Sequence, residues 1–323
     1  MRDDSAVAPV VAMILILAIV VTLLSAFQVT VVPAMKERSE MEHIAGVEMA
    51  LLRFSSHIEA AAAMKQPLSF SETVQLGGGD TMLNSIRSGG TLHVMNENRS
   101  YPVAGVSIQY EDSGGGNANI TSMVHLINVS YSTVGNFWRD QEYHWRWGIM
   151  FVHSGSRETP LQYPTMNEAN ESILDSGFPG SLLTIQTDER LIPERFENGT
   201  ITGNLTQKVT IRIERVSFSK GSQNFVSGNA NAKIALSTAR SETIVGNATG
   251  LEFRVSTQER IPESFRESLN RSLGHSLSAF ISKTGIPVLF ENNENRIWRI
   301  DTSEMDLLPD IILREIDITV TAG

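Results

Sequence analysis

The chain has 323 residues, of which 41% are hydrophobic, and it has a formal net charge of −10 and no cysteine. Without cysteine, disulfides, zinc–thiolate sites, cysteine nucleophiles and thiol redox centres are excluded. The acidic balance and the absence of clustered Lys and Arg argue against a nucleic-acid partner. The body of the protein must therefore be held together by core packing, for which the hydrophobic content is ample.

The first 35 residues form the most informative segment. Charged residues at 2–4 precede an uncharged run at 5–35, of which 8–32 is almost wholly aliphatic. About 20 such residues in a helix cross a hydrocarbon core of about 30 Å. A secretory signal would have a shorter apolar stretch followed by a cleavage site in small residues. We therefore expect a retained helix that crosses the cell membrane once and contacts its lipid.

The phrase DDSAVAPVVAMIL at 3–15 resembles the start of archaeal type IV pilins and pilin-like proteins, in which a short charged leader precedes an AVSPVIG-like phrase and an apolar stem. Ala8 stands where Ser is usual and Ala12 where Gly is usual. The resemblance is confined to residues 1–30. It implies that a prepilin peptidase cuts on the cytoplasmic side, in the region of Asp4, Ser5 and Ala6. The alternative is an uncleaved single-pass anchor.

In a filament, the aliphatic stem would pack against stems of other pilin-like subunits, because association removes its surface from water. The acidic residue that bacterial pilins place near the mature amino terminus is absent. The remaining candidates for setting the register are Pro9 and the small residues Ala12 and Ala18.

The orientation of the chain follows from the sequence beyond the stem, since basic residues near the two ends of the helix are almost balanced. Eight N-x-[ST] sequons occur, and all of them follow the stem. Their placement favours an extracytoplasmic body with the amino terminus in the cytoplasm, and each is a candidate glycosylation site. The eight acceptors are Asn98, Asn119, Asn128, Asn170, Asn198, Asn204, Asn247 and Asn270.

The helix is expected to continue beyond the membrane. Apolar residues at 44, 47, 51, 54, 58 and 62 recur at helical spacing on one face, which we expect to pack on the head. The predicted organisation is a leader at 1–5, a transmembrane stem at 6–34, an amphipathic helix at 35–66 and a β-rich head at 67–323. A break near 155–180 would divide the head into two subdomains.

The head is predicted to be mainly antiparallel, because strand-like segments alternate with turn clusters rather than with helices. One further helix is predicted at 262–283, and the fold class is α+β. Tyr143, Trp145 and Trp147 alternate onto one face of a strand, where we expect them to form core beneath the amphipathic helix. The predicted strands are 91–95, 103–110, 121–131, 141–152, 182–187, 209–218, 251–257, 297–301 and 312–321.

Catalytic and metal motifs are weak in this sequence. The segment Gly274–Ser278 approaches the G-x-S-x-G elbow of hydrolases, but it falls within the predicted helix and lacks the last Gly. The seven His residues are scattered without an H-x-x-x-H pair. We expect a protein that is not an enzyme and that has no cofactor and no metal site.

Three functions are compatible with this sequence. The first is a minor or accessory pilin-like subunit of an archaeal type IV pilus-type filament at the cell surface. The second is a membrane-anchored surface binding protein, such as an adhesin, that does not form filaments. The third is an anchored ectoenzyme, against which the weak motifs weigh. The stem phrase favours the first function.

Overall fold

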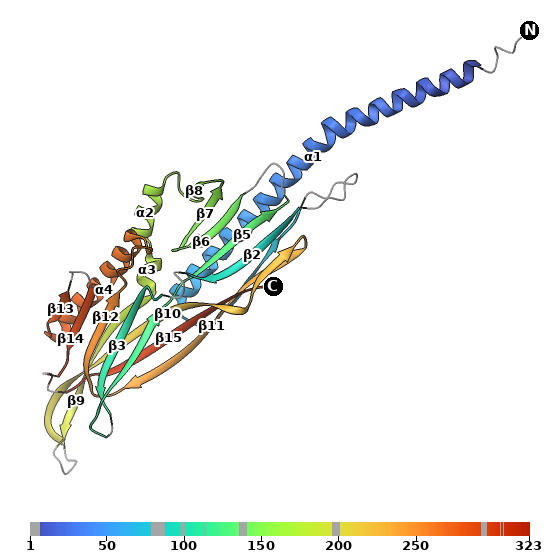
Figure 1. Ribbon diagram of the computed structural model, residues 1–323. Helices are drawn as coiled ribbons and strands as arrows, with labels where there is room; N and C mark the ends of the chain where they lie inside the picture. Colours follow the sequence, from blue (N-terminus) through green and yellow to red (C-terminus); the bar gives the residue numbers. More distant parts are fainter. Residues whose placement is uncertain are drawn as a thin grey trace, which may run out of the picture.

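The computed structural model describes residues 7–78, 88–97, 101–112, 114–135, 141–195, 201–291, 296–303, 305 and 307–323. For residues 7–9, 192–195 and 201–207 it describes the backbone only. The fold is α+β, as the sequence predicted. A long amino-terminal helix projects from a body made largely of antiparallel strands (Figure 1).

Helix α1 (Val7–Met64) has 58 residues and includes both the predicted stem and the predicted amphipathic segment. It continues through Pro33 without interruption. At 1.5 Å per residue it is about 90 Å long. Its last turn contains the alanines at 60–63, which are the strongest helix formers. It ends before Lys65, whose φ of 53° is incompatible with a further helical turn.

The larger of two sheets has ten strands in the order β1-β11-β15-β10-β2-β5-β6-β7-β8, with β9 paired to β10 outside this path. Its strands are β1 (Ser69–Gln75), β2 (Gly89–Asn96), β5 (Ile127–Val134), β6 (Glu142–Arg146), β7 (Ile149–Ser154), β8 (Arg157–Pro160), β9 (Leu183–Arg195), β10 (Ile201–Gly228), β11 (Asn231–Val245) and β15 (Asp310–Ala322).

The smaller sheet has five strands in the order β13-β14-β12-β3-β4. Both sheets take strands from either side of residues 155–180, where we expected a break between subdomains. The strands of the smaller sheet are β3 (Ala104–Glu111), β4 (Asn117–Val124), β12 (Ala248–Val255), β13 (Val288–Glu291) and β14 (Arg296–Asp301).

Strand β10 organises the larger sheet. It pairs in parallel with β15, whereas the other strand pairs of the described residues are antiparallel. Its opposite edge pairs first with β9 and then, at Phe225–Gly228, with β2. One strand of 28 residues therefore joins the two halves of the sheet.

Several predicted elements differ from the observed ones. The predicted strand at 121–131 is two strands, β4 and β5, which belong to different sheets, and the strand at 141–152 is the β6–β7 hairpin. Strands β1, β8, β11 and β13 lie outside the predicted segments. The predicted helix is present as α4 (Glu263–Thr284), and it is joined by α2 (Met166–Asp175) and α3 (Gly177–Ser181). The predicted helix is thus confirmed, and the two additional helices were not predicted because they are short and begin among turn-forming residues.

The upper half of α1 packs on the larger sheet, as the spacing of its apolar residues predicted. Val47, Leu51, Phe54 and Ile58 are each at most 2% exposed. Tyr143 and Trp145 of β6 are buried beneath the helix. Trp147 is buried too, but it lies in the turn after β6 with a φ of 60°, and its ring packs on Phe265 of α4, so it does not extend the strand as predicted. Trp145 Nε1 donates a hydrogen bond of 3.0 Å to Ser55 Oγ of α1, so the largest core side chain is also fixed in orientation.

This packing predicts unequal effects for two neighbouring positions on α1. Leu51→Ala removes a buried side chain and should lower the free energy of unfolding of the head by about 2–5 kcal/mol. Met49→Ala, at a side chain that is 56% exposed, should change it by less than about 0.5 kcal/mol. Urea unfolding of the full chain in non-ionic detergent, followed by tryptophan fluorescence, measures both. Equal effects would mean that Leu51 does not face the core.

Candidate functional site: the apolar stem and its anchorage in the head

The stem is the amino-terminal half of α1, and every residue from 10 to 31 is exposed. Its surface is aliphatic on all sides, with Met13 76%, Leu17 62% and Leu23 65% exposed. It is long and apolar enough to cross a membrane, and none of its most apolar window is buried. A helix that is apolar all round requires an apolar environment, either lipid or other helices.

The two threonines of the stem form hydrogen bonds within the helix. Thr22 Oγ1 donates to the carbonyl oxygen of Ala18, and Thr30 Oγ1 donates to that of Ala26, both at 2.7 Å. An unpaired hydroxyl in hydrocarbon would be costly. These two hydroxyls therefore do not oppose burial of the stem.

The sequence-predicted residues of the stem fall into two groups. Ala12 and Ala18 are exposed on α1 and are free to contact another helix. Pro9 lies in the first turn of α1, where a missing backbone N–H costs nothing. The side chain of Pro9 and the whole leader region at Asp4, Ser5 and Ala6 lie outside the described residues.

His43 holds α1 close to where the helix enters the head. This residue is 6% exposed, and its Nε2 lies 2.7 Å from the carbonyl oxygen of Gln75, the last residue of β1. Its ring also meets the edge of Tyr131, with centroids 6.4 Å apart. These contacts tie α1 to the end of β1, and Glu40, one turn earlier, is also buried at 5% exposed.

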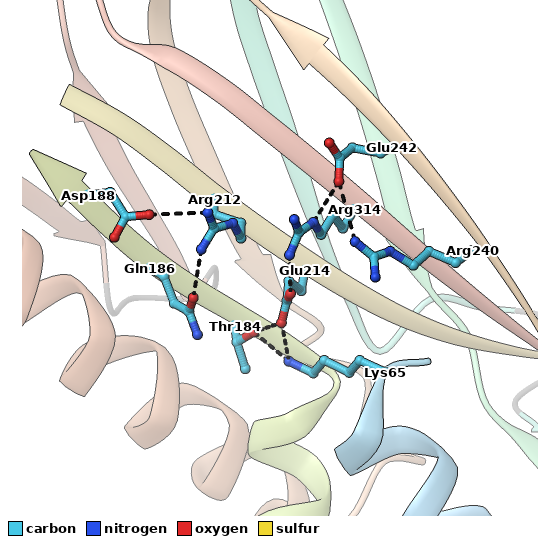
Figure 2. A network of polar contacts seen from close by, with 9 residues as sticks. All are labelled: Lys65, Thr184, Gln186, Asp188, Arg212, Glu214, Arg240, Glu242 and Arg314. Atoms are coloured by element: carbon cyan, nitrogen blue, oxygen red, sulfur yellow. Dashed lines mark hydrogen bonds and ion pairs between the residues drawn. The ribbon is translucent and has the colours of Figure 1, made fainter. Parts of the chain in front are cut away.

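The other end of α1 is anchored by an ion pair. Lys65 Nζ lies 3.1 Å from Glu214 Oε2 on β10 and 2.6 Å from Thr184 Oγ1 on β9. Both charged side chains are largely buried, with Lys65 13% and Glu214 15% exposed. Figure 2 shows Lys65 reaching from the end of the helix to this carboxylate.

A row of alternating charges continues from Glu214 across the sheet (Figure 2). Arg314 on β15 lies 3.3 Å from Glu214 Oε1 and 2.7 Å from Glu242 on β11. Arg240 closes the row at 3.4 Å from Glu242. The end of α1 is thus linked to three neighbouring strands.

A second cluster lies on the opposite face of the same strand pair. Arg215, which follows Glu214 in β10, pairs with Glu315 at 2.6 Å and with Asp317, both on β15. Its Nε donates to Ser122 Oγ of β4 at 2.9 Å. Because successive side chains of a strand face opposite sides, β10 ties α1 to one face of the sheet and the smaller sheet to the other.

A carboxylate in each cluster, Glu214 in the first and Glu315 in the second, has a lowered pKa. Burial alone would raise the pKa of Glu214, but Lys65 and Arg314 outweigh it and hold that pKa below its ordinary value of 4.5. For Glu315 burial also acts upward, and the Ser122 hydroxyl together with Arg215 lowers its pKa by more. Both groups therefore stabilise the folded chain in their ionised form.

The sequons differ in accessibility. Asn119, Asn170 and Asn247 are exposed. Asn128 is half-buried beside the buried Ser130, and half-buried Asn270 accepts a hydrogen bond of 2.9 Å from Trp298 Nε1. Asn98 and Asn198 lie outside the described residues, as does the side chain of Asn204 on β10.

The residues of the weak hydrolase-like phrase lie in a regular helix. The serine of the hydrolase-like phrase, Ser276, lies in α4 and donates to the carbonyl oxygen of Ser272 at 3.1 Å. Gly274 lies against the ring of Trp298. Among the described residues no group of His, Asp and Glu has the geometry of a metal site.

Comparisons with known proteins identify no relative: the chain matches no protein family, no curated protein and no solved structure. The stem and its anchorage are therefore interpreted from their own geometry.

The two charge clusters were not found by sequence reasoning. Lys65 and Glu214 are 149 residues apart in the chain. The available signal was the placement of charges inside two strand-like segments, Arg212-Ile-Glu-Arg and Arg314-Glu-Ile-Asp. Charges within a buried strand require partners, but the sequence does not specify which.

The lowered pKa of Glu214 predicts how stability depends on pH. A group whose pKa is lower in the folded state stabilises it above the unfolded pKa, and this contribution is lost as pH falls through the folded pKa. The free energy of unfolding should therefore decrease as the pH falls below 4.5, and less steeply for Glu214→Gln. Urea titrations of both proteins between pH 6 and pH 3 test this. Parallel curves would show that the Lys65–Glu214 pair does not stabilise the fold.

Proposed function

We propose that this chain is a non-enzymatic pilin-like surface protein, a minor or accessory subunit of an archaeal type IV pilus-type filament that assembles through its apolar stem. In this proposal the amino terminus is cytoplasmic and the head is extracytoplasmic. A prepilin peptidase removes the leader, and the partners of the stem are membrane lipid and other pilin-like subunits.

The observation that carries the proposal is the division of α1. Its first half is exposed and aliphatic on every side, and its second half is built into the head along one face. Because the helix is continuous, the head is joined to the stem without an intervening loop. Such a rod can move from a bilayer into a bundle of like helices while the head keeps its contacts.

The competing function is a monomeric surface binding protein that uses the stem only as an anchor. The same exposed stem is compatible with it, since lipid satisfies an aliphatic helix as well as other helices do. The two functions differ in one physical respect. Only assembly requires close contact between stems, so only assembly is sensitive to side-chain volume at small residues.

This difference gives a direct test at Ala18. Ala18→Trp adds a large apolar side chain, which the membrane tolerates but a close helix contact does not. We expect surface filaments seen by electron microscopy to be lost while the protein still fractionates with membranes. Leu17→Met conserves volume and should assemble normally.

The mass of the mature amino terminus supplies a second measurement on the same preparations. Loss of the leader in both variants would show that the Trp acts on assembly and not on processing. Unchanged filaments in Ala18→Trp, with the protein in the membrane, would replace the pilin-like function by that of an anchored binding protein.

An extracytoplasmic head also predicts which sequons are modified. In a host that glycosylates Asn in sequons, we expect glycans at the exposed Asn119, Asn170 and Asn247 and little at Asn128 and Asn270, whose side chains are half-buried. Mass spectrometry of proteolytic peptides measures occupancy. A glycan at Asn270 without one at Asn247 would contradict this order, and unmodified exposed sequons would argue against an extracytoplasmic head.

A further inference from the structure

The smaller sheet carries a groove of about 370 Å³ on its outer face. Ser122 of β4 contacts Arg215 and Glu315 of the larger sheet on the inner face, so its neighbours Thr121 and Met123 face outward. Both of these neighbours line the groove. The other walls come from β3, from β12 and from the segments that precede β3 and follow β12. The stem and the charge clusters make no use of this groove.

The apolar part of the lining suits an aromatic ring. Gly105 of β3 is buried beneath Met123, because a Cβ at this glycine would lie 2.5 Å from the Met123 sulfur. Tyr101, which is 53% exposed, and Pro102 line the groove just before β3 begins. A thioether and an exposed ring both make favourable contacts with a further aromatic ring. The glycine leaves the strand backbone accessible to a flat group once the flexible methionine side chain moves aside.

The charges in the lining already have partners. Glu252 and Arg254 of β12 are its charged residues, and Glu252 accepts hydrogen bonds from Arg254 at 2.8 Å and from Arg299 at 3.0 Å. Ser107 Oγ donates to Asn119 Oδ1 at 2.8 Å. The other polar side chains of the lining are neutral and belong to Tyr101, Thr121, Ser256 and Gln258. A charged ligand would have to compete with these ion pairs, so the groove favours an uncharged one.

The groove borders an open edge of the sheet. Strand β4 pairs with β3, and no described strand pairs with its other side. On the inner face Ile120 of β4 is half-buried, whereas Ile108, which lies opposite it on β3, is fully buried. The core of the smaller sheet is therefore incompletely covered at this edge, and a further strand beside β4 would cover Ile120.

Strand β4 lacks the features that protect sheet edges. Edge strands are commonly very short or carry a charge or a proline, and each of these features hinders pairing with another chain. Strands β8 and β13 have four residues each, β1 contains Glu72, and β9 contains Asp188, Glu189 and Arg190. Strand β4 has eight residues, Asn117–Val124, with neither a charge nor a proline. Among the described edges it is therefore the one most suited to accept a strand.

We propose that the edge of β4 and the groove together bind an extended, uncharged segment of another protein, which adds a strand to the smaller sheet and places an aromatic side chain in the groove. Backbone hydrogen bonds to β4 supply affinity, and the groove supplies selectivity for the ring. Because successive side chains of a strand alternate, the residues flanking the ring cover Ile120 on the inner face. A second copy of β4 would not fill the groove, since its outward-facing residues include no aromatic ring.

The test uses the acetylated and amidated peptide Ser-Val-Tyr-Val-Ser, titrated by ligand-observed NMR into the full chain in non-ionic detergent. The protein is produced in a host without N-glycosylation, because Asn119 lies on the same face of β4. We expect this peptide to bind at least fivefold more tightly than Ser-Val-Ser-Val-Ser, which lacks the ring. N-acetyltyrosine amide, which has the ring without the strand, should also bind at least fivefold more weakly. Equal affinities of the two peptides, or binding of neither, would overturn the proposal.

Two methylated forms of the tyrosine peptide test the strand pairing. The N–H groups of successive residues in a strand point to opposite edges, so methylation of both valine nitrogens blocks one edge of the peptide and methylation of the tyrosine nitrogen blocks the other. If the peptide pairs with β4, one form loses at least tenfold in affinity and the other binds as before. Equal binding of the two forms would overturn the proposal. An affinity that falls as the protein concentration rises would show that a second copy occupies the edge, and would overturn it as well.

Two variants assign the ring to the groove. Tyr101→Ala removes the exposed ring, and Gly105→Val adds a side chain against Met123. Each should reduce the affinity for the tyrosine peptide at least fivefold. Leu289→Ala, at a side chain that is 67% exposed on the opposite edge strand of the same sheet, should leave it unchanged. Circular dichroism verifies that each variant is folded. Unchanged affinity in folded Tyr101→Ala, or an equal loss in Leu289→Ala, would overturn the proposal.

Discussion

Burial of one face of α1 is the interaction on which the rest of the structure depends. The residues from Ile44 to Ala62 on that face have little or no exposure, and they cover Tyr143 and Trp145 of β6. Because α1 is one continuous helix, the same contact that completes the core also sets the direction in which the stem leaves the head. The packing of α1 in the core and the direction of the stem therefore depend on the same contacts. A change in this packing also alters the direction of the stem.

The parallel pair of β10 and β15 supports this arrangement from beneath. Glu214 and Arg215 are adjacent in β10 and point to opposite faces. Glu214 pairs with Lys65 at the end of α1, and Arg215 contacts Ser122 of the smaller sheet. Replacing buried ion pairs by apolar residues is often neutral, so the effect of these pairs is to fix which elements meet. An uncompensated charge on either face would be costly.

The sequence predicted the parts of this fold that depend on local periodicity. The buried face of α1, the α4 helix and the alternation of Tyr143 and Trp145 in β6 all follow from spacing alone, whereas Trp147 lies in the turn after β6. The separation of β4 from β5 does not follow from spacing, since 121–131 contains neither Gly nor Pro to mark a turn, and the change of sheet occurs at His125, whose backbone pairs with Phe218 of β10. Helix α3, with the sequence Gly-Phe-Pro-Gly-Ser, has the composition of a turn and is helical only in its tertiary setting. The charge clusters were equally out of reach, because their members come together from distant parts of the chain.

The most direct test of the central claim is hydrogen exchange of the backbone amides of α1 between residues 44 and 58, measured on the full chain in detergent at increasing urea concentrations. If this half of the helix is part of the core of the head, its amides exchange only through global unfolding, and their exchange free energies converge with those of β10 and β15. Exchange through a smaller opening, with β10 and β15 still protected, would mean that α1 is an independent stalk resting on the head. That result would contradict the claim that burial of α1 completes the core and sets the direction of the stem.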